Sequence, residues 1–193
     1  MTSSIGEDFC SAGTEHLLLR RPRTSDLQAV HLIHADPATN VYNPAGPDLD
    51  MAASARRLQE WIGHWDRHSF GYWAVESLDS MKPEGAAGVI GFAGLRLTRW
   101  LDQNVLNLYY RLAPDVWGRG FAVEAARHAL LLGARHFPDI PVIARTKPEN
   151  IPSQRTALAA GLLRRKDLDR DDGSGQSVIF STHTPERTDR TAQ

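Results

Sequence analysis

The chain has little of what several protein classes require. It holds one cysteine, Cys10, in 193 residues, which excludes an intrachain disulfide framework. No apolar run approaches the roughly 20 residues that a membrane-spanning helix needs. Residues 1–14 lack the apolar segment of a secretory signal. The formal net charge of −1 predicts no general attraction to nucleic acid or to anionic membranes. We therefore expect a cytoplasmic protein with neither of these partners.

What remains has the composition of an ordinary globular domain. Apolar residues make up 41% of the chain and charged residues 23%, and the length fits a single domain with its own core. We expect the folded domain to cover residues 15–183. Polar segments at residues 1–14 and 184–193 are predicted to be flexible tails.

Hydrophobic periodicity predicts the element order β-α-α-β-β-β-α-β-α-β-β. The segment 36–49 is rich in proline, glycine and asparagine, which predicts a long loop without regular structure. The order indicates an α+β fold with a mostly antiparallel sheet flanked by helices. The strands on either side of the third helix should be parallel. We expect strands at 16–20, 70–77, 89–98, 105–112, 142–146, 162–168 and 176–182, and helices at 26–35, 50–67, 122–136 and 151–160.

The most informative stretch is Asp115–Glu124, where a strand leads through a glycine-containing loop into a helix. Glycines let the backbone approach a phosphate closely, and a helix start offers unpaired N–H groups. No lysine follows as in a Walker A loop. Val123 stands where a dinucleotide fingerprint has Gly or Ala. These residues predict another kind of phosphate site, with a plain tight turn as the alternative.

From His16 to about Phe180 the sequence resembles the GCN5-related N-acetyltransferase (GNAT) superfamily, in particular the branch with the ribosomal-protein N-terminal acetyltransferases. Two motifs in the expected order carry the resemblance: YRLAPDVWGRGFAVEA at 110–125 and PENIPSQR at 148–155. It implies a GNAT fold and acetyl-CoA, with the pyrophosphate on the central strand-to-helix loop. The implied cofactor-binding residues are Tyr110, Arg111, Leu112, Trp117, Gly118, Arg119, Gly120, Phe121, Ala122, Asn150 and Ser153.

The resemblance also implies catalytic roles. A bulge in the strand ending at Leu112 would part it from the next parallel strand, and the Leu112 N–H would stabilise the oxyanion. Asn150 is a good helix N-cap and would also contact the pantetheine arm. Ser153 would protonate the leaving thiolate, or would be a plain first-turn residue. Many members have a Tyr four residues before the glycine that matches Gly161. Ala157 stands there instead, which leaves Ser153, a water or no acid at all.

An amine with a pKa near 10 must lose a proton before it attacks. Water relays are common in this family, and the candidate bases are Glu76, Asp36, His31 and His34. The family's acceptor-binding region corresponds to residues 36–49 and the helix after them. The candidate substrate contacts are Asp36, Tyr42 and Asn43, with ordinary loop structure as the alternative.

Glu124 and the pair His64 and His68 are expected to have structural roles and no part in catalysis or metal binding. Glu124 lies in the first turn of a helix, where an acidic residue is typically a partner of the helix dipole. His64 and His68 are four residues apart on a helix. No third ligand accompanies them, so a solvated helix end is expected and no metal site.

Together these points predict an acetyl-CoA-dependent N-acetyltransferase in which a primary amine attacks directly in a ternary complex. The acceptor is a protein N-terminus or a small-molecule amine, and the protein is a monomer or a homodimer. Because the family tyrosine is missing and no base is established, a non-catalytic acyl-CoA-binding sensor or regulatory module is the alternative. A different nucleotide-binding enzyme is the third hypothesis.

Overall fold

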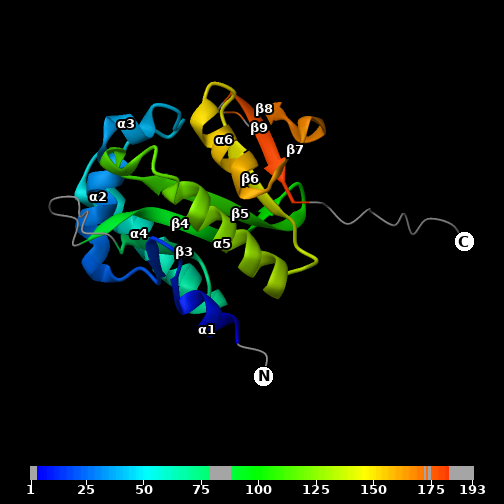
Figure 1. Ribbon diagram of the computed structural model, residues 1–193. Helices are drawn as coiled ribbons and strands as arrows, with labels where there is room; N and C mark the ends of the chain where they lie inside the picture. The colour runs from blue at the N-terminus through cyan, green and yellow to red at the C-terminus, as the bar shows by residue number, and fades with distance from the viewer. Residues whose placement is uncertain (1–3, 79–87, 172, 174, 183–193) are drawn as a thin grey trace, which may run out of the picture.

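The computed structural model describes residues 4–78, 88–171, 173 and 175–182 of the chain. Its centre is a nine-stranded sheet in the order β1-β2-β3-β4-β5-β6-β9-β7, with β8 paired to β9 (Figure 1). Within these residues, no helix is both long and apolar enough to cross a membrane. The strands are β1 Ser11–Gly13, β2 Leu17–Arg20, β3 Tyr72–Ser77, β4 Val89–Trp100, β5 Gln103–Leu112, β6 Val142–Thr146, β7 Leu163–Arg164, β8 Arg170–Asp171 and β9 Gln176–Ser181.

Every strand pair is antiparallel except β5 with β6. The prediction of an α+β fold with one parallel pair around the third long helix is confirmed. The α-helices are α1 Ile5–Cys10, α2 Leu27–Ala35, α3 Pro37–Asn40, α4 Met51–His68, α5 Phe121–His136 and α6 Ile151–Ala160. Short 3₁₀ turns lie at Thr24–Asp26, Pro114–Val116 and Lys166–Leu168.

Helices cover both faces of the sheet (Figure 1). On one face, α2 and α4 pack on β4 and β5, where the Trp61 ring lies 5.0 Å from Phe92 and 6.1 Å from Tyr109. On the other face, α5 runs across β4 and β5. Its Gly133 lies against the sheet, since a Cβ there would be 3.0 Å from Leu95 Cδ1. The side chains of β5 therefore alternate between an α2/α4 face and an α5/α6 face.

The segment expected to be an N-terminal tail, residues 1–14, contains a helix and a strand. Helix α1 begins with a capping box formed by Ser4 and Glu7, and β1 pairs with β2. Phe9 is fully buried and stacks on Trp73, whose indole N–H donates to the Phe9 carbonyl at 2.7 Å. One large apolar side chain thus holds this short segment on the core. The expected C-terminal tail at 184–193 lies outside the described residues.

Two element boundaries also differ from expectation. The segment 36–49 contains the short helix α3, because Asp36 accepts from the Ala38 N–H and Pro37 begins the turn. The strand expected at 162–168 is reduced to Leu163–Arg164, after which the chain forms a 3₁₀ turn. The Arg164 guanidinium pairs with Asp169 across that turn.

Candidate active site

The parallel strands β5 and β6 part shortly after they meet. Their register covers only Leu106 opposite Val142 and Asn107 opposite Ile143, although β5 continues to Leu112 and β6 to Thr146. We call this divergence the strand fork. The predicted bulge in β5 is absent, because β5 pairs with β4 without a shift from Gln103 to Leu112. A register shift occurs instead between β3 and β4, at Val75 and Glu76.

Leu112 presents its backbone to the strand fork. The Ala113 N–H donates to the Ile90 carbonyl at 2.8 Å, so the neighbouring pair Gly91–Leu112 is a non-hydrogen-bonded pair. The N–H and C=O of Leu112 then point away from β4. The Trp117 indole donates to this carbonyl at 2.8 Å. A Cβ at Gly91 would lie 2.2 Å from Leu112 Cδ2, so this close pairing of β4 with β5 requires glycine.

Residues 118–122 form a backbone cradle at the start of α5. Gly118 and Gly120 have φ angles of 77° and 83°, the left-handed region that favours glycine. No atom lies within 4 Å of a Cβ built on either residue. Gly120 is the N-cap, and its carbonyl accepts from the Glu124 N–H at 2.9 Å. The N–H groups of residues 121–123 precede that first helical bond, so they are available to an anion at the positive end of the helix.

The side chains around this cradle differ in exposure. Trp117 is 52% exposed although its indole N–H is bonded, and Arg119 is exposed. Phe121 is buried and Ala122 half-buried, so these two offer a ligand mainly their backbone. The open glycine positions and the unpaired helical N–H groups fit a diphosphate.

The first turn of α6 faces β5 across the fork. The Asn150 side chain accepts from the Ser153 N–H at 3.1 Å, which confirms it as the N-cap. The Tyr110 hydroxyl donates to the Ser153 carbonyl at 2.8 Å and lies 3.1 Å from Ser153 Oγ. Burial raises the pKa of the Tyr110 phenol, and the Ser153 hydrogen bond opposes this only in part. Tyr110 is therefore a neutral O–H group at physiological pH.

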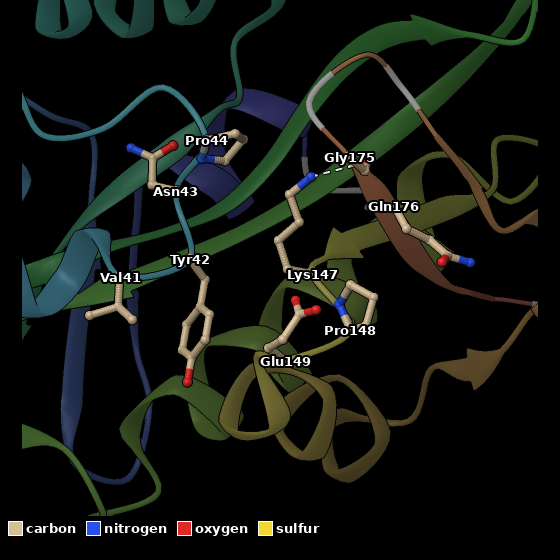
Figure 2. A pocket seen from close by; sticks show the side chains of 9 residues that line it. All are labelled: Val41, Tyr42, Asn43, Pro44, Lys147, Pro148, Glu149, Gly175 and Gln176. Atoms are coloured by element: carbon tan, nitrogen blue, oxygen red, sulfur yellow. Dashed lines mark hydrogen bonds between the residues drawn. The ribbon is translucent and has the colours of Figure 1, made fainter.

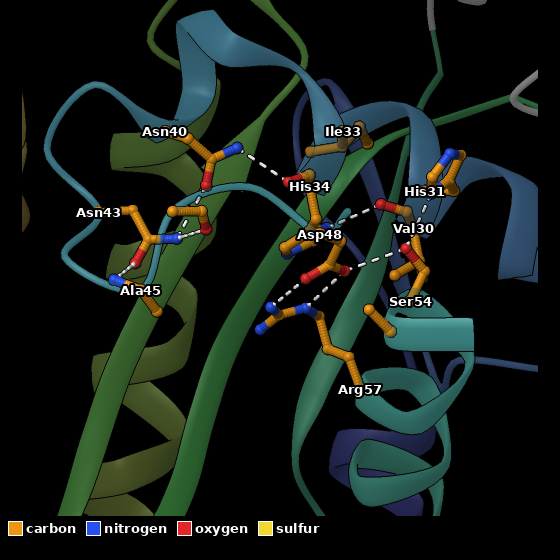
Figure 3. A network of polar contacts seen from close by, with 12 residues as sticks. Val30, His31, Ile33, His34, Asn40, Asn43, Ala45, Asp48, Ser54 and Arg57 are labelled. Atoms are coloured by element: carbon orange, nitrogen blue, oxygen red, sulfur yellow. Dashed lines mark hydrogen bonds and ion pairs between the residues drawn. The ribbon is translucent and has the colours of Figure 1, made fainter. Parts of the chain in front are cut away.

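On the opposite side of β5, residues 36–49 form what we call the acceptor loop. Its centre is the buried Asn40 (Figure 3). The Asn40 amide donates to the carbonyls of His34 and Asp36, both at 2.8 Å. Its Oδ1 accepts from Arg111 Nη1 at 2.9 Å and from Asn43 Nδ2 at 2.8 Å. Arg111 thus ties the loop to β5, a role that sequence reasoning missed.

The three residues predicted to contact the acceptor have different surroundings in the structure. Asp36 caps α3 and lies outside the hollow described below. Asn43 donates to Asn40 and to the Gly46 carbonyl and accepts from the Ala45 N–H, so its side chain serves the loop itself. Tyr42 remains 39% exposed at the edge of the loop.

The candidate histidine bases lie within polar networks. His34 is fully buried; its Nδ1 bonds the Val30 carbonyl at 2.9 Å and its Nε2 bonds the Tyr109 hydroxyl at 2.7 Å. Burial, with the charges of Arg111 and Arg57, lowers the pKa of His34 to about 3. His31 bonds Ser54 at 3.1 Å.

Asp48 completes this network at the end of the acceptor loop (Figure 3). It accepts from Ser54 Oγ at 3.0 Å and from both arms of Arg57 at 2.5 and 3.0 Å. Burial alone would raise the pKa of Asp48, but the Arg57 hydrogen bonds outweigh it and hold that pKa below its usual value.

Glu76, the remaining candidate base, pairs with a buried arginine. Its Oε1 accepts from Arg20 Nε at 2.6 Å, while Arg20 also forms a bidentate pair with Asp26. Glu124 is more than a helix-dipole partner. Its carboxylate accepts from the Thr14 hydroxyl at 2.5 Å and the His16 N–H at 2.8 Å, and so joins α5 to the start of β2.

The sequence predicted a solvated helix end at His64, but the structure shows this residue buried. Its Nδ1 bonds the Phe70 carbonyl at 2.8 Å, and its Nε2 accepts from the Leu97 N–H at 3.2 Å. Burial lowers the pKa of His64 to about 4. Both ring nitrogens are used. In the part of the chain that the structure describes, no cluster of three or more metal-ligating side chains occurs.

A hollow of about 630 Å³ lies between the acceptor loop and the turn from β6 to α6 (Figure 2). Glu149 is the one carboxylate among the described residues that line it, and its side chain is exposed and makes no hydrogen bond or ion pair with any of them. Sequence reasoning missed Glu149, although it directly precedes the motif residue Asn150. The lining residues are Val41, Tyr42, Asn43, Pro44, Lys147, Pro148, Glu149, Gly175 and Gln176.

The parted parallel strands and the backbone cradle fit the class of coenzyme A-dependent acyltransferases. The model of the acetyltransferase (GNAT) domain family matches residues 16–163, which is more than half of the chain. The protein therefore belongs to the GNAT acetyltransferase family, whose acetyl donor is acetyl-CoA.

Solved structures agree with this fold. An acetyltransferase from Agrobacterium tumefaciens str. C58 aligns with a TM-score of 0.72 at 20% identity, over 90% of this chain and 94% of that chain. A ribosomal-protein-S5-alanine acetyltransferase from Vibrio fischeri gives 0.65 at 16%, over 91% and 97%. RimL, a ribosomal L7/L12 alpha-N-protein acetyltransferase in complex with coenzyme A, gives 0.62 at 14%, over 89% and 96%.

Proposed function

We propose that this protein is an N-acetyltransferase that moves the acetyl group of acetyl-CoA to a primary amine by direct attack in a ternary complex. It acts in the cytoplasm as a monomer or a homodimer. The observation that carries the proposal is the continuity between hollow and strand fork. Residues 147–149 line the hollow, and the next residue, Asn150, caps the helix turn whose Ser153 contacts Tyr110 on β5. We infer that an amine in the hollow reaches the fork from this side.

Different groups of the protein bind the cofactor, stabilise the oxyanion and contact the leaving sulfur. The N–H groups of residues 121–123 hold the pyrophosphate, and the Leu112 N–H faces the fork as a donor for a developing oxyanion. Acetyl-CoA supplies an activated acetyl group: a bond forms between the amine nitrogen and the acyl carbon, and the carbon–sulfur bond breaks. Ser153 offers its hydroxyl proton to the departing sulfur. A thiol has a pKa near 8.5, so a hydrogen bond at this atom suffices to stabilise its anion.

The amine must arrive neutral, and no histidine is among the described residues that line the hollow. His34 and His64 are buried with both ring nitrogens bonded. We propose that the amine proton leaves to water in the open hollow. The carboxylate of Glu149 attracts the ammonium form and holds it beside Tyr42, whose aromatic ring adds a cation–π contact.

The acceptor is a protein N-terminus or a small-molecule amine. Val41 at the rim of the hollow is 69% exposed and Tyr42 is 39% exposed, and such apolar groups suit either a peptide or an amine with an apolar stem. Two of the structural neighbours described above are ribosomal-protein acetyltransferases, which supports the inclusion of N-terminal peptides among the acceptors tested.

The test is turnover with a defined acceptor panel. Acetyl-CoA is mixed with N-terminal peptides, polyamines, amino acids and aminoglycosides, free thiol is followed, and the product is identified by mass spectrometry. Amine-dependent thiol release with an N-acetylated product is expected. Binding of acetyl-CoA without turnover on any acceptor would favour the sensor alternative, for which the absence of a hydroxyl at Ala157 is the supporting feature.

Glu149→Gln tests the role of the hollow. It is expected to raise the KM for the amine about threefold, because one exposed attractive charge is lost. The affinity for acetyl-CoA should not change. Glu149→Asp keeps the charge and should behave like the wild type, and Glu60→Gln removes an exposed carboxylate from α4 as a control. An unchanged amine KM in Glu149→Gln would remove Glu149 from the acceptor site.

A further inference from the structure

We propose that Tyr110 is a positioning residue that orients the Ser153 hydroxyl in the strand fork. The inference rests on the proposed function and extends it to a residue that touches Ser153 at two atoms. The Tyr110 hydroxyl lies 2.8 Å from the Ser153 carbonyl and 3.1 Å from Ser153 Oγ. One phenol group thus holds both the backbone and the side chain of Ser153.

The two contacts define two arrangements of hydrogen bonds. The phenol has a single proton. When this proton goes to the Ser153 carbonyl, Ser153 Oγ–H is the donor in the 3.1 Å contact and its proton faces Tyr110. When the phenol rotates to donate to Oγ, the Ser153 proton is directed away from Tyr110. The second arrangement leaves the Ser153 O–H free to donate a hydrogen bond to a sulfur anion in the fork.

Exchange between these two hydrogen-bond arrangements requires little free energy. The Ser153 carbonyl lies in the first turn of α6, where helix geometry also gives it the Ala157 N–H as a donor. It therefore keeps a partner when the phenol turns to Oγ. Ala157 is one turn further on, on the same face of α6, and its methyl group brings no competing polar atom.

The surroundings keep the phenol in its neutral form. Its hydroxyl is enclosed between β5 and α6, and the side chain is mostly buried. A neutral O–H can donate or accept as the arrangement requires, whereas a phenolate could only accept. The adjacent Tyr109 does not compete for Ser153, because its hydroxyl bonds His34 on the other face of the sheet.

The test is a double-mutant cycle on turnover with Tyr110→Phe and Ser153→Ala. Tyr110→Phe is expected to lower kcat about tenfold, the largest effect of one neutral hydrogen bond, and to change the KM for acetyl-CoA by less than about threefold. Ser153→Ala should lower kcat at least as much. Because both hydroxyls act as one unit, the double variant should match Ser153→Ala within about twofold.

A matched control removes another buried phenol. Tyr72→Phe loses the 2.7 Å bond from Asn107 Nδ2 on the α2/α4 face and should leave kcat unchanged. Three outcomes would overturn the proposal. The first is a double variant whose loss of kcat equals the product of the two single losses. The others are a change of KM alone in Tyr110→Phe and an unchanged kcat in either single variant. Ser153 is half-buried in the first turn of α6, where alanine is a good helix former, so this arm stands even if Tyr110→Phe folds poorly. A wild-type protein without turnover on any amine defeats the proposed function itself, and this inference with it.

Discussion

The two sides of β5 are built by different means. On the α5 side, the cradle at residues 118–122 is made of backbone, with two glycines at positive φ and the free N–H groups of a helix start. On the α2 side, the acceptor loop is made of side chains that bond one another around Asn40. A backbone site can serve every enzyme that binds the same diphosphate. A side-chain site must be rebuilt for each acceptor.

This difference explains why most polar residues of the acceptor loop are not available to a substrate. Asp36, Asn40, Asn43 and Asp48 all use their side-chain polar atoms in contacts within the protein. The partners lie on the loop or on α4 and, for Asn40, also on α2 and β5. The loop has few regular hydrogen bonds, and these side chains replace them. The groups at the hollow that we assign to the acceptor are the ring of Tyr42, on the loop, and the carboxylate of Glu149, on the turn before α6.

The largest predicted effect comes from a charge placed in the backbone cradle. Gly120→Asp should weaken acetyl-CoA binding about 100-fold, because a carboxylate about 5 Å from a phosphate repels it by several kcal/mol at an effective dielectric of about 20. The fold should tolerate the change, since no atom lies within 4 Å of the added Cβ and Asp is tolerated at positive φ. Isothermal calorimetry measures the affinity.

Two control variants are needed. One separates the effect of the added charge from that of backbone strain, and the other separates the cradle from the acceptor loop. Gly120→Asn has the same shape without the charge and should lose less than about tenfold in affinity. Gly46→Asp places the same residue at φ 70° in the acceptor loop, again in open space, and should leave acetyl-CoA affinity unchanged. Equal affinities for Gly120→Asp and the wild type would mean that the phosphates bind elsewhere.

The backbone side was also the part that sequence could predict. Gly118, Gly120, the N-cap Asn150 and the parallel pair β5–β6 follow from local rules on glycine, capping and connection handedness. The acceptor side follows no such rule, because Asp36 and Asn43 are as suitable for capping and turn formation as for substrate binding. The contacts in the folded protein decide between these uses: Asp36 caps α3, and Asn43 bonds Asn40, which Arg111 holds on β5.

A second prediction removes the centre of the side-chain network. Asn40→Ala should cost about 2–3 kcal/mol of unfolding free energy, because Arg111 Nη1 and the His34 carbonyl lose a buried partner. The amine KM should rise about tenfold as the loop loosens, while acetyl-CoA affinity stays within about twofold. Urea unfolding and steady-state kinetics measure the two effects. Asn104→Ala, at an exposed asparagine of β5, is the control.

The two measurements together show whether the two sides of β5 act independently. A change in amine KM without a change in acetyl-CoA affinity means that the strand transmits little from one face to the other. A parallel loss of both affinities would contradict the division, and would make Arg111 a coupling residue between acceptor loop and strand fork.

The smallest predicted effect uses pH to lower the stability of the fold through a buried histidine on the acceptor side. His34 is buried against Tyr109 on β5, with Arg111, Arg57 and Asp48 as the charged groups around it, and burial holds its native pKa at about 3. The unfolded chain has a histidine pKa near 6.5. Below about pH 6.5 the unfolded state binds a proton that the native state does not, so stability is full above that pH and falls towards pH 3.

At pH 5.5 this linkage amounts to about 1.4 kcal/mol relative to pH 7.5, and any native pKa below about 4.5 gives the same value. The measurement is the urea unfolding free energy of the wild type and His34→Gln at both pH values. His64, with a native pKa of about 4, contributes equally to both proteins and cancels in the difference. The variant should therefore lose about 1.4 kcal/mol less than the wild type on acidification. An equal loss in both proteins would mean that His34 is protonated in the native state.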